Sequence, residues 1–392
     1  MAGDTLLDFY NLDELLTPEE RLVRDSVRSW VQEKFMPRVQ QSFRDGTFPT
    51  ELIPDLGELG IFGVTIKGNG CPGLSYVAYG LAMQEIEAAD SGLRSFASVQ
   101  GGLSMTAIDL FGSDEQKSKY LPELASARML SCFGLTEPDF GSNPGGMLTR
   151  AAKDGDEWVL NGTKMWITNG SVADIAVVWA KTEADDPKSI RGFIVPTDTP
   201  GFTANKITGK LSMRASITSE LVLEDVRIPA GNMLPNVQGL KGPLSCLNHA
   251  RYGIVWGVIG AARSCYEEAL SYSKNRVQFD KPIAGYQLTQ QKLTDMVQEI
   301  TKAQLLSWRL GRLLDSGQCK PHHISLAKRN NVQMALDVAR SARSILGGNG
   351  ILDEYHSLRH AVNLETVYTY EGTHEMHTLM VGQAVTGIPA YS

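Results

Sequence analysis

Cysteine is scarce in this chain of 392 residues, and the five that occur are scattered at positions 71, 132, 246, 265 and 319. The number is odd and no Cys-x-x-Cys pair is present, which indicates reduced intracellular thiols rather than a disulfide framework. In that setting, the sequons at Asn161 and Asn169 are interpreted as turns and not as glycosylation sites.

Long apolar runs and basic runs are also missing. Without an apolar stretch of spanning length, no transmembrane helix and no membrane insertion are expected. The net charge of −7 and the pI of about 5.6 argue against a nucleic-acid partner. The acidic start, Met1 to Leu16, lacks the order of a signal peptide. We therefore expect a cytoplasmic protein if the source is bacterial, and the mitochondrial matrix if the chain is a mature eukaryotic one.

Two pairs of histidines, His356/His360 and His374/His377, are close enough in sequence to raise the question of a metal. The second pair is not a His-Glu-x-x-His motif, and no metal site is expected.

The chain is 42% hydrophobic, so it can bury a large core over more than one domain. Residues 1–129 are predicted to be a helical domain. Thr17-Pro18-Glu19-Glu20 and Ser113-Asp114-Glu115-Gln116 both have the pattern of a helix start. Between them, apolar residues recur at helical spacing.

Residues 130–240 are predicted to be a β domain, a barrel or a sandwich. Residues 158–167 form two β-rich runs around Asn161-Gly162, which predicts a hairpin turn at that dipeptide. Short strands follow near 175–179, 192–195 and 221–228. Residues 241–392 return to helical periodicity and are predicted to form a four-helix bundle. The fold class is therefore mixed α and β, multidomain, in the order helical, β, helical.

One carboxylate near the C-terminus is the leading catalytic candidate. Glu371 lies between Tyr370 and Gly372, after a largely apolar run. Apolar surroundings disfavour the charged carboxylate and raise its pKa toward the working pH, as a general base requires. Gly372 lets a ligand approach the backbone. From these residues alone, an ordinary loop carboxylate before a helix is the alternative.

Three further stretches have a chemical and a purely structural interpretation. Residues 133–142 are rich in backbone donors and hydroxyls suited to a polar ring or phosphate, or they form a surface loop. Trp166-Ile167-Thr168 offers an indole to stack on a flat cofactor, or it is a plain strand end. Gly347 to Gly350 allows close approach of a pyrophosphate, but it is not a dinucleotide fingerprint.

Together, these motifs resemble those of the acyl-CoA dehydrogenases over essentially the whole chain. The resemblance runs through residues 133–138, 161–168, Arg276-x-Gln278-Phe279, residues 346–350 and Tyr370-Glu371-Gly372-Thr373. It implies non-covalently bound FAD, an acyl-CoA substrate, an electron-transfer flavoprotein as electron acceptor and a homotetramer.

The resemblance also implies roles for individual residues. The FAD contacts that it implies are Phe133, Leu135, Thr136, Gly141, Ser142, Trp166, Ile167, Thr168, Arg276, Phe279, Gln287, Ser344, Leu346, Gly347, Gly348, Thr373 and Glu375. Arg276, Gln287 and residues 344–348 would reach the FAD of a neighbouring subunit. Glu375 stands where relatives often carry glutamine.

The same resemblance assigns the proton abstraction to Glu371, because residues 249–253 hold no carboxylate that could replace it. The substrate contacts that it implies are Arg94, Ser95, Ser142, Leu247, Asn248, Arg251 and Gly372. The backbone N–H of Glu371 would donate to the thioester oxygen.

Arg94 is a charged residue in an apolar helical region, and it indicates one subfamily. An arginine in an apolar helical region needs an anionic partner, which a dicarboxylic acyl chain can supply. With residues 247–253 and 369–374, this position is similar to the glutaryl-CoA dehydrogenase subfamily. The resemblance implies oxidation and decarboxylation of glutaryl-CoA to crotonyl-CoA and CO₂. On residue types alone, Arg94 could equally pair with Glu87 or Asp90 and touch no ligand.

Three alternatives stay open: a short-chain acyl-CoA dehydrogenase, a non-decarboxylating glutaryl-CoA dehydrogenase, and an assembly partner that has lost activity.

Overall fold

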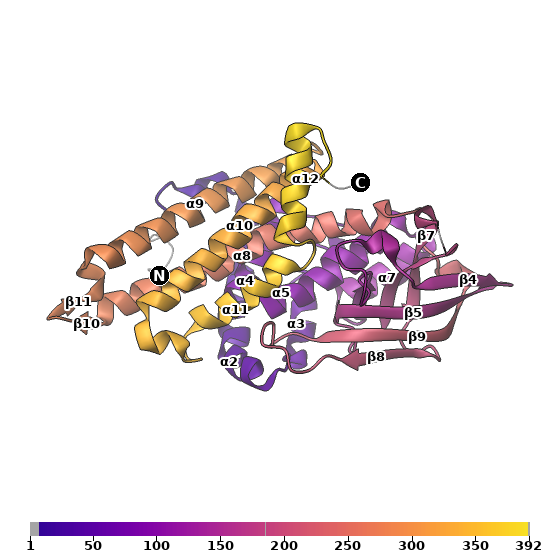
Figure 1. Cartoon of the computed structure of the whole chain (residues 1–392), viewed down its shortest axis with the longest axis horizontal. Coiled ribbons are helices and arrows are strands. Elements are labelled where there is room, and N and C mark those ends of the chain that lie inside the picture. The colour runs from indigo at the N-terminus through magenta and orange to yellow at the C-terminus, as the bar shows by residue number, and fades with distance from the viewer. Residues whose placement is uncertain (1–7, 185, 391–392) are drawn as a thin grey trace.

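The computed structural model describes residues 8–184 and 186–390. The segment Met1–Leu7 lies outside the described residues. The expectation that Met1 to Leu16 is not a signal peptide therefore stays a prediction. None of the described helices is long and apolar enough to cross a membrane. The chain runs from helices through a sheet to long helices, which confirms the predicted fold class (Figure 1).

The first part of the chain is mainly helical. Its elements are α1 Pro18–Trp30, α2 Met36–Asp45, α3 Ile53–Glu58, the short strands β1 Lys67–Gly68 and β2 Cys71–Pro72, α4 Tyr76–Ala89, α5 Ser91–Ala97, α6 Thr106–Phe111 and α7 Asp114–Ala125. Both predicted helix starts are confirmed as capping boxes, one at Thr17 and one at Ser113. The helix α4 is buried along nearly its whole length, which makes it the central helix of this part.

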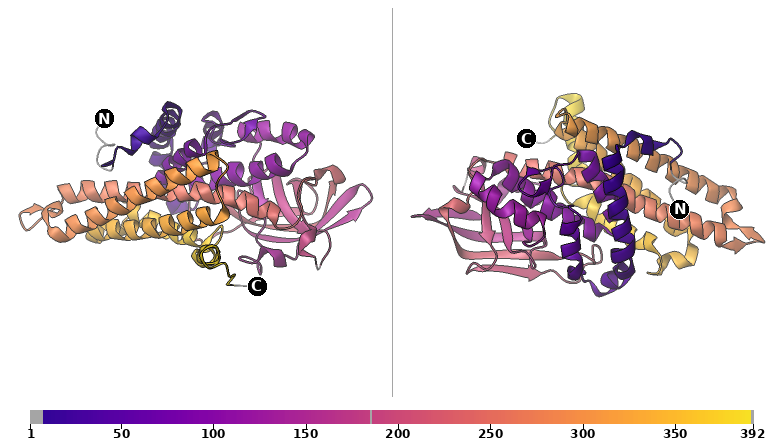
Figure 2. Two further views of the ribbon diagram at one scale, coloured as in Figure 1. Left: turned by 90° about the horizontal axis from the view of Figure 1, so that it is seen from above. Right: turned by 180° about the vertical axis from the view of Figure 1, so that it is seen from behind.

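The middle part is a single curled sheet in the described residues. Its strands are β3 Ser131–Gly134, β4 Arg150–Asp154, β5 Glu157–Thr168, β6 Ile175–Lys181, β7 Ile190–Pro196, β8 Phe202–Lys206 and β9 Thr218–Pro229. The order is β3-β6-β4-β5-β9-β8, and β7 pairs with β6. All pairings are antiparallel except those of β6 with β3 and with β4. The sheet and the bundle lie toward opposite ends of the longest axis (Figures 1 and 2).

The hairpin predicted at Asn161-Gly162 is wrong. Both residues lie inside the continuous strand β5, and the turn is formed by the two residues between β4 and β5, Gly155-Asp156. Gly162 instead marks a β-bulge in the pairing of β5 with β9, with φ of 149°. A Cβ at this position would come within 2.5 Å of Thr149 Oγ1, so glycine is required for close approach and not for a turn.

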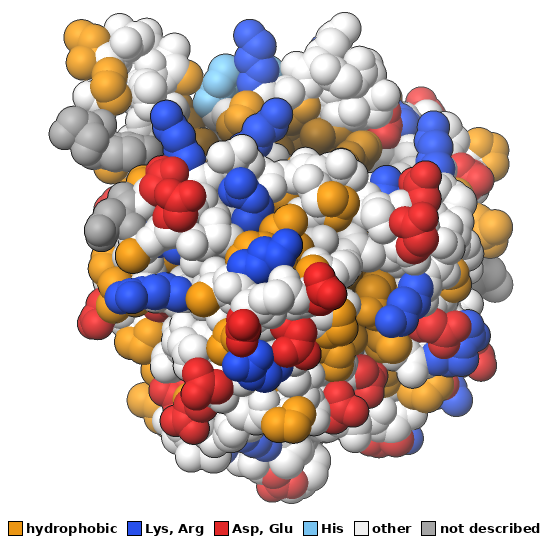
Figure 3. Space-filling model, turned by 90° about the vertical axis from the view of Figure 1, so that its right-hand side faces the viewer, with side chains coloured by type: hydrophobic (Ala, Val, Ile, Leu, Met, Phe, Trp, Pro, Cys, Tyr) orange, Lys and Arg blue, Asp and Glu red, His pale blue; other side chains and the backbone are white. Residues whose placement is uncertain are grey.

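The last part is the helical bundle. It contains α8 Lys241–Asn275, the short strands β10 Val277–Gln278 and β11 Lys281–Pro282, α9 Gln287–Asp315, α10 Pro321–Ile345, α11 His356–Thr369 and α12 His374–Thr386. The helix α8 packs against both α4 and α10, so it joins the bundle to the first part. The division into domains at 129/130 and 240/241 stays a prediction. On the sheet end, acidic and basic side chains are interspersed rather than gathered by sign (Figure 3).

Candidate active site

Glu371 lies in the tight turn that joins α11 to α12. The turn is short because α11 ends at Thr369 and the Thr373 side chain caps α12, accepting from the Met376 backbone N–H at 3.2 Å. Glu371 has the left-handed φ of 52°, and the next residue, Gly372, has φ of 95°. Left-handed backbone is strained for a residue with a side chain, so the surroundings must hold Glu371 in place.

Glu371 is half-buried as a residue, and its oxygen Oε2 is buried without a hydrogen-bond partner in the described part of the chain. Burial raises the pKa of this carboxyl group, as expected from the sequence. The cations Arg94, Lys328 and Arg251 act in the opposite direction. A carboxylate with a raised pKa and an unused oxygen has the properties of a general base.

Arg94 lies on α5 with no exposed surface and forms an ion pair with Glu87 of α4, where Nε and Oε2 are 2.8 Å apart. Its other two nitrogens, Nη1 and Nη2, are buried and have no hydrogen-bond partner among residues 8–184 and 186–390. The guanidinium lies 5.4 Å from the centre of the Tyr370 ring, beside Glu371. The sequence left open whether Arg94 pairs with Glu87, and the structure shows that Glu87 satisfies only one side of it.

Asp90 is not the partner of Arg94. Its carboxylate is 3.1 Å from Arg359 of α11, and it accepts hydrogen bonds from Asn363 at 3.0 Å and from the Gly92 backbone N–H at 2.7 Å. Asp90 therefore caps α5, the helix of Arg94, and ties it to α11, the helix that leads to Glu371.

Two polar side chains near Arg94 were not predicted from the sequence. Ser98 follows Arg94 by four residues and so lies on the same side of that helical stretch. Its buried Oγ and the buried hydroxyl of Tyr79 interact with each other, and neither has a further hydrogen-bond partner in the described residues. The spacing from Arg94 was a usable signal for Ser98, whereas Tyr79 lies on α4 and gave none. The predicted Ser95 is also buried on α5.

The helix α8 carries the other predicted substrate contacts. Arg251 donates from Nε to the Glu371 carbonyl at 2.6 Å and from Nη1 to Asn248 Oδ1 at 3.1 Å. Asn248 also lines a cavity of about 220 Å³ with Tyr76 and His249. Leu247 is half-buried on the same helix, and Gly372 lies next to Glu371 in the turn. The structure therefore groups Arg251, Asn248 and Gly372 around Glu371.

The loop after β3, expected to meet the flavin edge, is held by a buried ion pair. Lys164 of β5 has no exposed side-chain surface, and its Nζ lies 2.8 Å from Glu137 Oε1 and 3.1 Å from the Leu135 carbonyl. Glu137 also accepts from the backbone N–H groups of Leu148 and Thr149. Although burial opposes it, Lys164 keeps the pKa of Glu137 below its ordinary value.

Trp166 lies beside this loop, because the Met165 backbone N–H donates to the Thr136 carbonyl at 2.8 Å. Trp166 has φ of 64° at a second irregularity of β5, and 61% of its surface is exposed. An exposed indole held next to a braced loop fits a flat aromatic cofactor. Ile167 is buried and Thr168 half-buried beyond it. Phe133 and Leu135 are buried, while Gly141 and Ser142 are exposed.

The remaining predicted cofactor contacts fall into two groups. Thr373 and Glu375 lie at the start of α12, next to Glu371. The others are at the far end of the bundle, around the β10–β11 hairpin and the end of α10 (Figure 1). They are Arg276, Phe279, Gln287, Ser344, Leu346, Gly347 and Gly348. Phe279 is 90% exposed there. One chain does not bring this second group together with Glu371.

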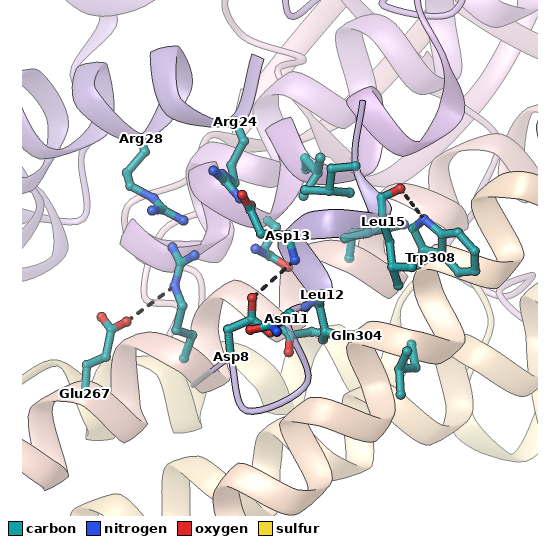
Figure 4. Close-up of a pocket in the computed structure, with 16 residues that line it drawn as sticks. Asp8, Asn11, Leu12, Asp13, Leu15, Arg24, Arg28, Glu267, Gln304 and Trp308 are labelled. Carbon is teal, nitrogen blue, oxygen red and sulfur yellow. Dashed lines mark hydrogen bonds and ion pairs between the residues drawn. The ribbon is translucent and has the colours of Figure 1, made fainter. Parts of the chain in front are cut away.

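A cavity of about 330 Å³ lies away from these residues, between the N-terminal segment and α1, α4, α8 and α9 (Figure 4). It is lined by charged side chains such as Arg24, Arg28 and Glu267, and by Trp308, whose indole donates to the Leu15 carbonyl at 3.3 Å. None of the predicted site residues lines it.

No group of three or more His, Cys, Asp or Glu side chains suited to hold a metal occurs in residues 8–184 and 186–390. His356 and His360 lie one turn apart on α11. The Nδ1 of His356 is 3.2 Å from Arg359 Nη1, and His360 is buried next to it.

Comparisons with known proteins agree with this arrangement. Three family models match: acyl-CoA dehydrogenase N-terminal domain over residues 17–128, middle domain over 132–226 and C-terminal domain over 237–386. The chain is 36% identical to a probable acyl-CoA dehydrogenase of Bacillus subtilis (strain 168), covering 94% of this chain and 98% of that one. It is 34% identical to the short-chain specific mitochondrial acyl-CoA dehydrogenase of Homo sapiens, covering 93% and 90%.

This chain therefore belongs to the acyl-CoA dehydrogenase family, and it is an FAD-dependent enzyme of that family. Among solved structures, it is similar to two of glutaryl-CoA dehydrogenase from Mycobacterium smegmatis. The one in complex with FADH2 is 54% identical, with a TM-score of 0.96 and coverage of 98% of this chain and 99% of that one. The other is 57% identical, with a TM-score of 0.95 and coverage of 97% and 98%.

A chain from a structure described as electron transferring flavoprotein of Acidaminococcus fermentans is also similar, at 31% identity and a TM-score of 0.92, over 95% of this chain and 98% of that one.

Proposed function

We propose that this enzyme oxidises glutaryl-CoA at the bond between the α and β carbons and then decarboxylates it to crotonyl-CoA and CO₂. The observation that carries the proposal is the incomplete hydrogen bonding of the buried Arg94 side chain. Two of its buried nitrogens lack partners in the described residues, and an uncompensated guanidinium is costly in a buried place. The distal carboxylate of a dicarboxylic acyl chain supplies two oxygens in the geometry that these nitrogens require.

Glu371 is the proposed base. Its raised pKa and unpaired Oε2 suit removal of the α proton of the thioester. The developing negative charge on the thioester oxygen requires hydrogen-bond donors, and the Glu371 backbone N–H is one candidate. Arg94 at one end of the acyl chain and Glu371 at the other then fix which carbon loses its proton.

FAD supplies the acceptor for the hydride that leaves the β carbon. Phe133, Leu135 and Thr136 would hold the edge of its ring system, with Trp166, Ile167 and Thr168 against the ring. Gly141, Ser142, Thr373 and Glu375 would contact its remaining parts in the same subunit.

Decarboxylation follows from the position of the distal carboxylate. After dehydrogenation, the bond from the γ carbon to the carboxylate lies next to the new double bond, which is conjugated with the thioester. Breaking that bond releases CO₂ and leaves its electron pair as a dienolate, which the donors at the thioester oxygen stabilise. A proton delivered to the γ carbon gives crotonyl-CoA, and protonated Glu371 is the proposed source of that proton.

We further propose a homotetramer, because the second group of cofactor candidates lies far from Glu371 within one chain. Arg276, Phe279, Gln287 and residues 344–348 would contact FAD in a neighbouring subunit. Phe279, with its exposed ring, is a side chain that such a contact would cover. The similarity to a chain from a structure of an electron transferring flavoprotein supports a protein of that type as the electron acceptor.

The alternative is a short-chain acyl-CoA dehydrogenase or a glutaryl-CoA dehydrogenase that does not decarboxylate. The similarity to short-chain enzymes at 34% identity supports the first of these. The glutaryl-CoA proposal agrees better with the 54–57% identity to the Mycobacterium smegmatis enzymes and with the buried Arg94.

The experiment is an anaerobic titration of the purified enzyme with glutaryl-CoA and, separately, with butyryl-CoA, with the flavin absorbance recorded and CO₂ trapped. The proposal predicts bleaching of the flavin at low glutaryl-CoA concentration and one CO₂ per crotonyl-CoA formed. Preferential bleaching by butyryl-CoA supports the short-chain alternative. Bleaching by glutaryl-CoA with accumulation of glutaconyl-CoA and no CO₂ supports the non-decarboxylating one.

A further inference from the structure

Three consecutive backbone carbonyls in the turn of Glu371 accept hydrogen bonds from two buried cations. The ammonium of Lys328, on α10, donates to the Tyr370 carbonyl and, at 2.7 Å, to the Gly372 carbonyl. The guanidinium of Arg251, on α8, donates to the Glu371 carbonyl between them at 2.6 Å. Two helices of the bundle, α8 and α10, therefore donate hydrogen bonds to the same turn.

Lys328 is an unusual residue for this position. It is 1% exposed, and a buried ammonium is normally paired with a carboxylate. The partners found for its Nζ are carbonyl oxygens, together with the Tyr370 ring 5.8 Å away. Burial lowers the pKa of Lys328, and the nearby Glu371 acts in the opposite direction. With its pKa lowered to about 7, Lys328 is fully charged only at acidic pH, and its Nζ donates to two carbonyls of the turn.

The turn needs this support because its backbone is strained. Glu371 has φ of 52°, a conformation that costs a residue with a side chain about 1–3 kcal/mol unless its surroundings fix it. Gly372 is packed closely, since a Cβ there would lie 3.0 Å from His377 Nε2 and 3.3 Å from Arg251 Nη2. Lys328 Nζ and Arg251 Nε donate to backbone carbonyls of the turn and not to the Glu371 carboxylate, whose Oε2 has no hydrogen-bond partner in the described residues.

We propose that Lys328, together with Arg251, is a positioning residue. It holds the Tyr370–Gly372 turn so that the Glu371 carboxylate faces the substrate and can accept its α proton. The inference deepens the proposed function and rests on the assignment of Glu371. Lys328 touches neither substrate nor cofactor in this account and acts through the turn. Its charge also stabilises the carboxylate form of Glu371.

The charged and titratable groups around the Lys328 ammonium come from every element packed against it. They are Glu371 and Tyr370 in the turn, Arg251 on α8, Arg94 on α5, and His374 and His377 on α12. Burial lowers the pKa of His377 to about 3, so this ring is neutral over the working range. Lys328, Arg251 and Arg94 are therefore the cations that favour ionised Glu371, and the loss of one should be visible in the pH profile.

The test compares Lys328→Met, Lys328→Gln and Lys328→Arg with the wild-type enzyme, and measures FAD content, melting temperature and the pH profile of kcat/KM for glutaryl-CoA. In Lys328→Met, kcat should fall by roughly 10- to 100-fold, as for a misplaced catalytic group, with a smaller change in KM. The acid limb should move to higher pH, because Glu371 has lost a neighbouring positive charge. Lys328→Arg keeps the charge and should keep the acid limb in place.

Lys328→Gln serves if Lys328→Met does not fold, because the amide keeps an N–H donor while the charge is lost. Its acid limb should also move to higher pH. Lys302→Met is the matched control, since it removes a surface ammonium that pairs with Glu299.

A wild-type acid limb and wild-type kcat in the neutral variants would overturn the inference. Turnover retained by Glu371→Gln would instead overturn the proposed base, so the two failures are distinguishable.

Discussion

Arg94 donates from Nε to Oε2 of Glu87 at 2.8 Å, and neither side chain has exposed surface. This contact uses one edge of the guanidinium and leaves Nη1 and Nη2 without partners in the described residues. Glu87 also keeps one buried oxygen, Oε1, without a partner there. The ion pair is therefore buried, but its hydrogen bonding is incomplete, unlike that of a purely structural ion pair. The two unpaired nitrogens suit a site that binds a second carboxylate, that of the substrate.

Replacement of Glu371 by glutamine should lower kcat by about 10²–10⁴-fold, because the amide keeps the shape but accepts no proton. FAD content should stay unchanged. Glu365→Gln is the matched control, since Glu365 is an exposed carboxylate on α11 that pairs with Arg340. Near-normal flavin reduction by glutaryl-CoA in Glu371→Gln would move the base elsewhere.

The wild-type enzyme should lose kcat/KM as the pH falls. The base must be ionised, and burial raises the pKa of Glu371 above its ordinary value of 4.5. The acid limb should therefore lie above pH 4.5, measured at saturating electron acceptor. An acid limb at or below that pH would show that the three cations outweigh burial.

The ion pair between Lys164 and Glu137 should control FAD affinity. Lys164→Met leaves Glu137 as an unpaired buried carboxylate and removes the donor to the Leu135 carbonyl. The loss of one partner of a buried pair costs about 3–5 kcal/mol of stability. We expect a lower melting temperature of the apoprotein and weaker FAD binding, measured by flavin release on dilution.

The double variant Lys164→Met/Glu137→Met separates the two effects. It replaces the pair with apolar side chains, which is often neutral for stability. The melting temperature should recover in part, whereas FAD affinity should stay low because the Leu135 carbonyl still lacks its donor. Full recovery of FAD affinity would show that the pair serves only stability.

Glu85 should govern part of the acid stability. Burial alone would raise its pKa, but Arg263 and Arg28 hold the pKa at about 2. The folded pKa is depressed, so the stability from this triad is present above about pH 4.5 and is lost as the pH falls toward 2. Glu85→Gln should cost about 3–5 kcal/mol near neutral pH and less at acidic pH.

Chemical denaturation at several pH values measures this difference for Glu85→Gln. Glu299→Gln, at a surface pair with Lys302, is the control and should change stability by about 1 kcal/mol or less. An equal loss at pH 7 and at pH 3 would contradict the electrostatic origin.

The parts of the fold that depend on neighbouring residues were predictable from the sequence. The capping boxes at Thr17 and Ser113 are examples, because both partners lie within three residues. The hairpin predicted at Asn161-Gly162 failed because long-range pairing of β5 with β9 outweighed a local turn preference. The turn formed at Gly155-Asp156 instead.

The candidate site was only partly predictable for the same reason. The raised pKa of Glu371 was predicted from its apolar neighbours in sequence, and its burial in the structure raises the pKa in the same direction. Lys328 lies on α10 and is separated from Glu371 in sequence by the whole of α11. Its contact with the turn depends on how α10 packs against α11 and α12. Whether Glu87 or Asp90 pairs with Arg94 was also undecided, because Arg359, which satisfies Asp90, is remote in sequence.

The most direct test of the substrate assignment is the ratio of kcat/KM for glutaryl-CoA to that for butyryl-CoA, measured in the wild-type enzyme and in Arg94→Leu. The account predicts that the substitution lowers kcat/KM for glutaryl-CoA. The corresponding activation free energy should rise by about 2–5 kcal/mol, as for a broken buried charge pair. Oxidation of butyryl-CoA should be equal or improved. An equal proportional loss for both substrates would contradict the account and leave Arg94 as a structural partner of Glu87.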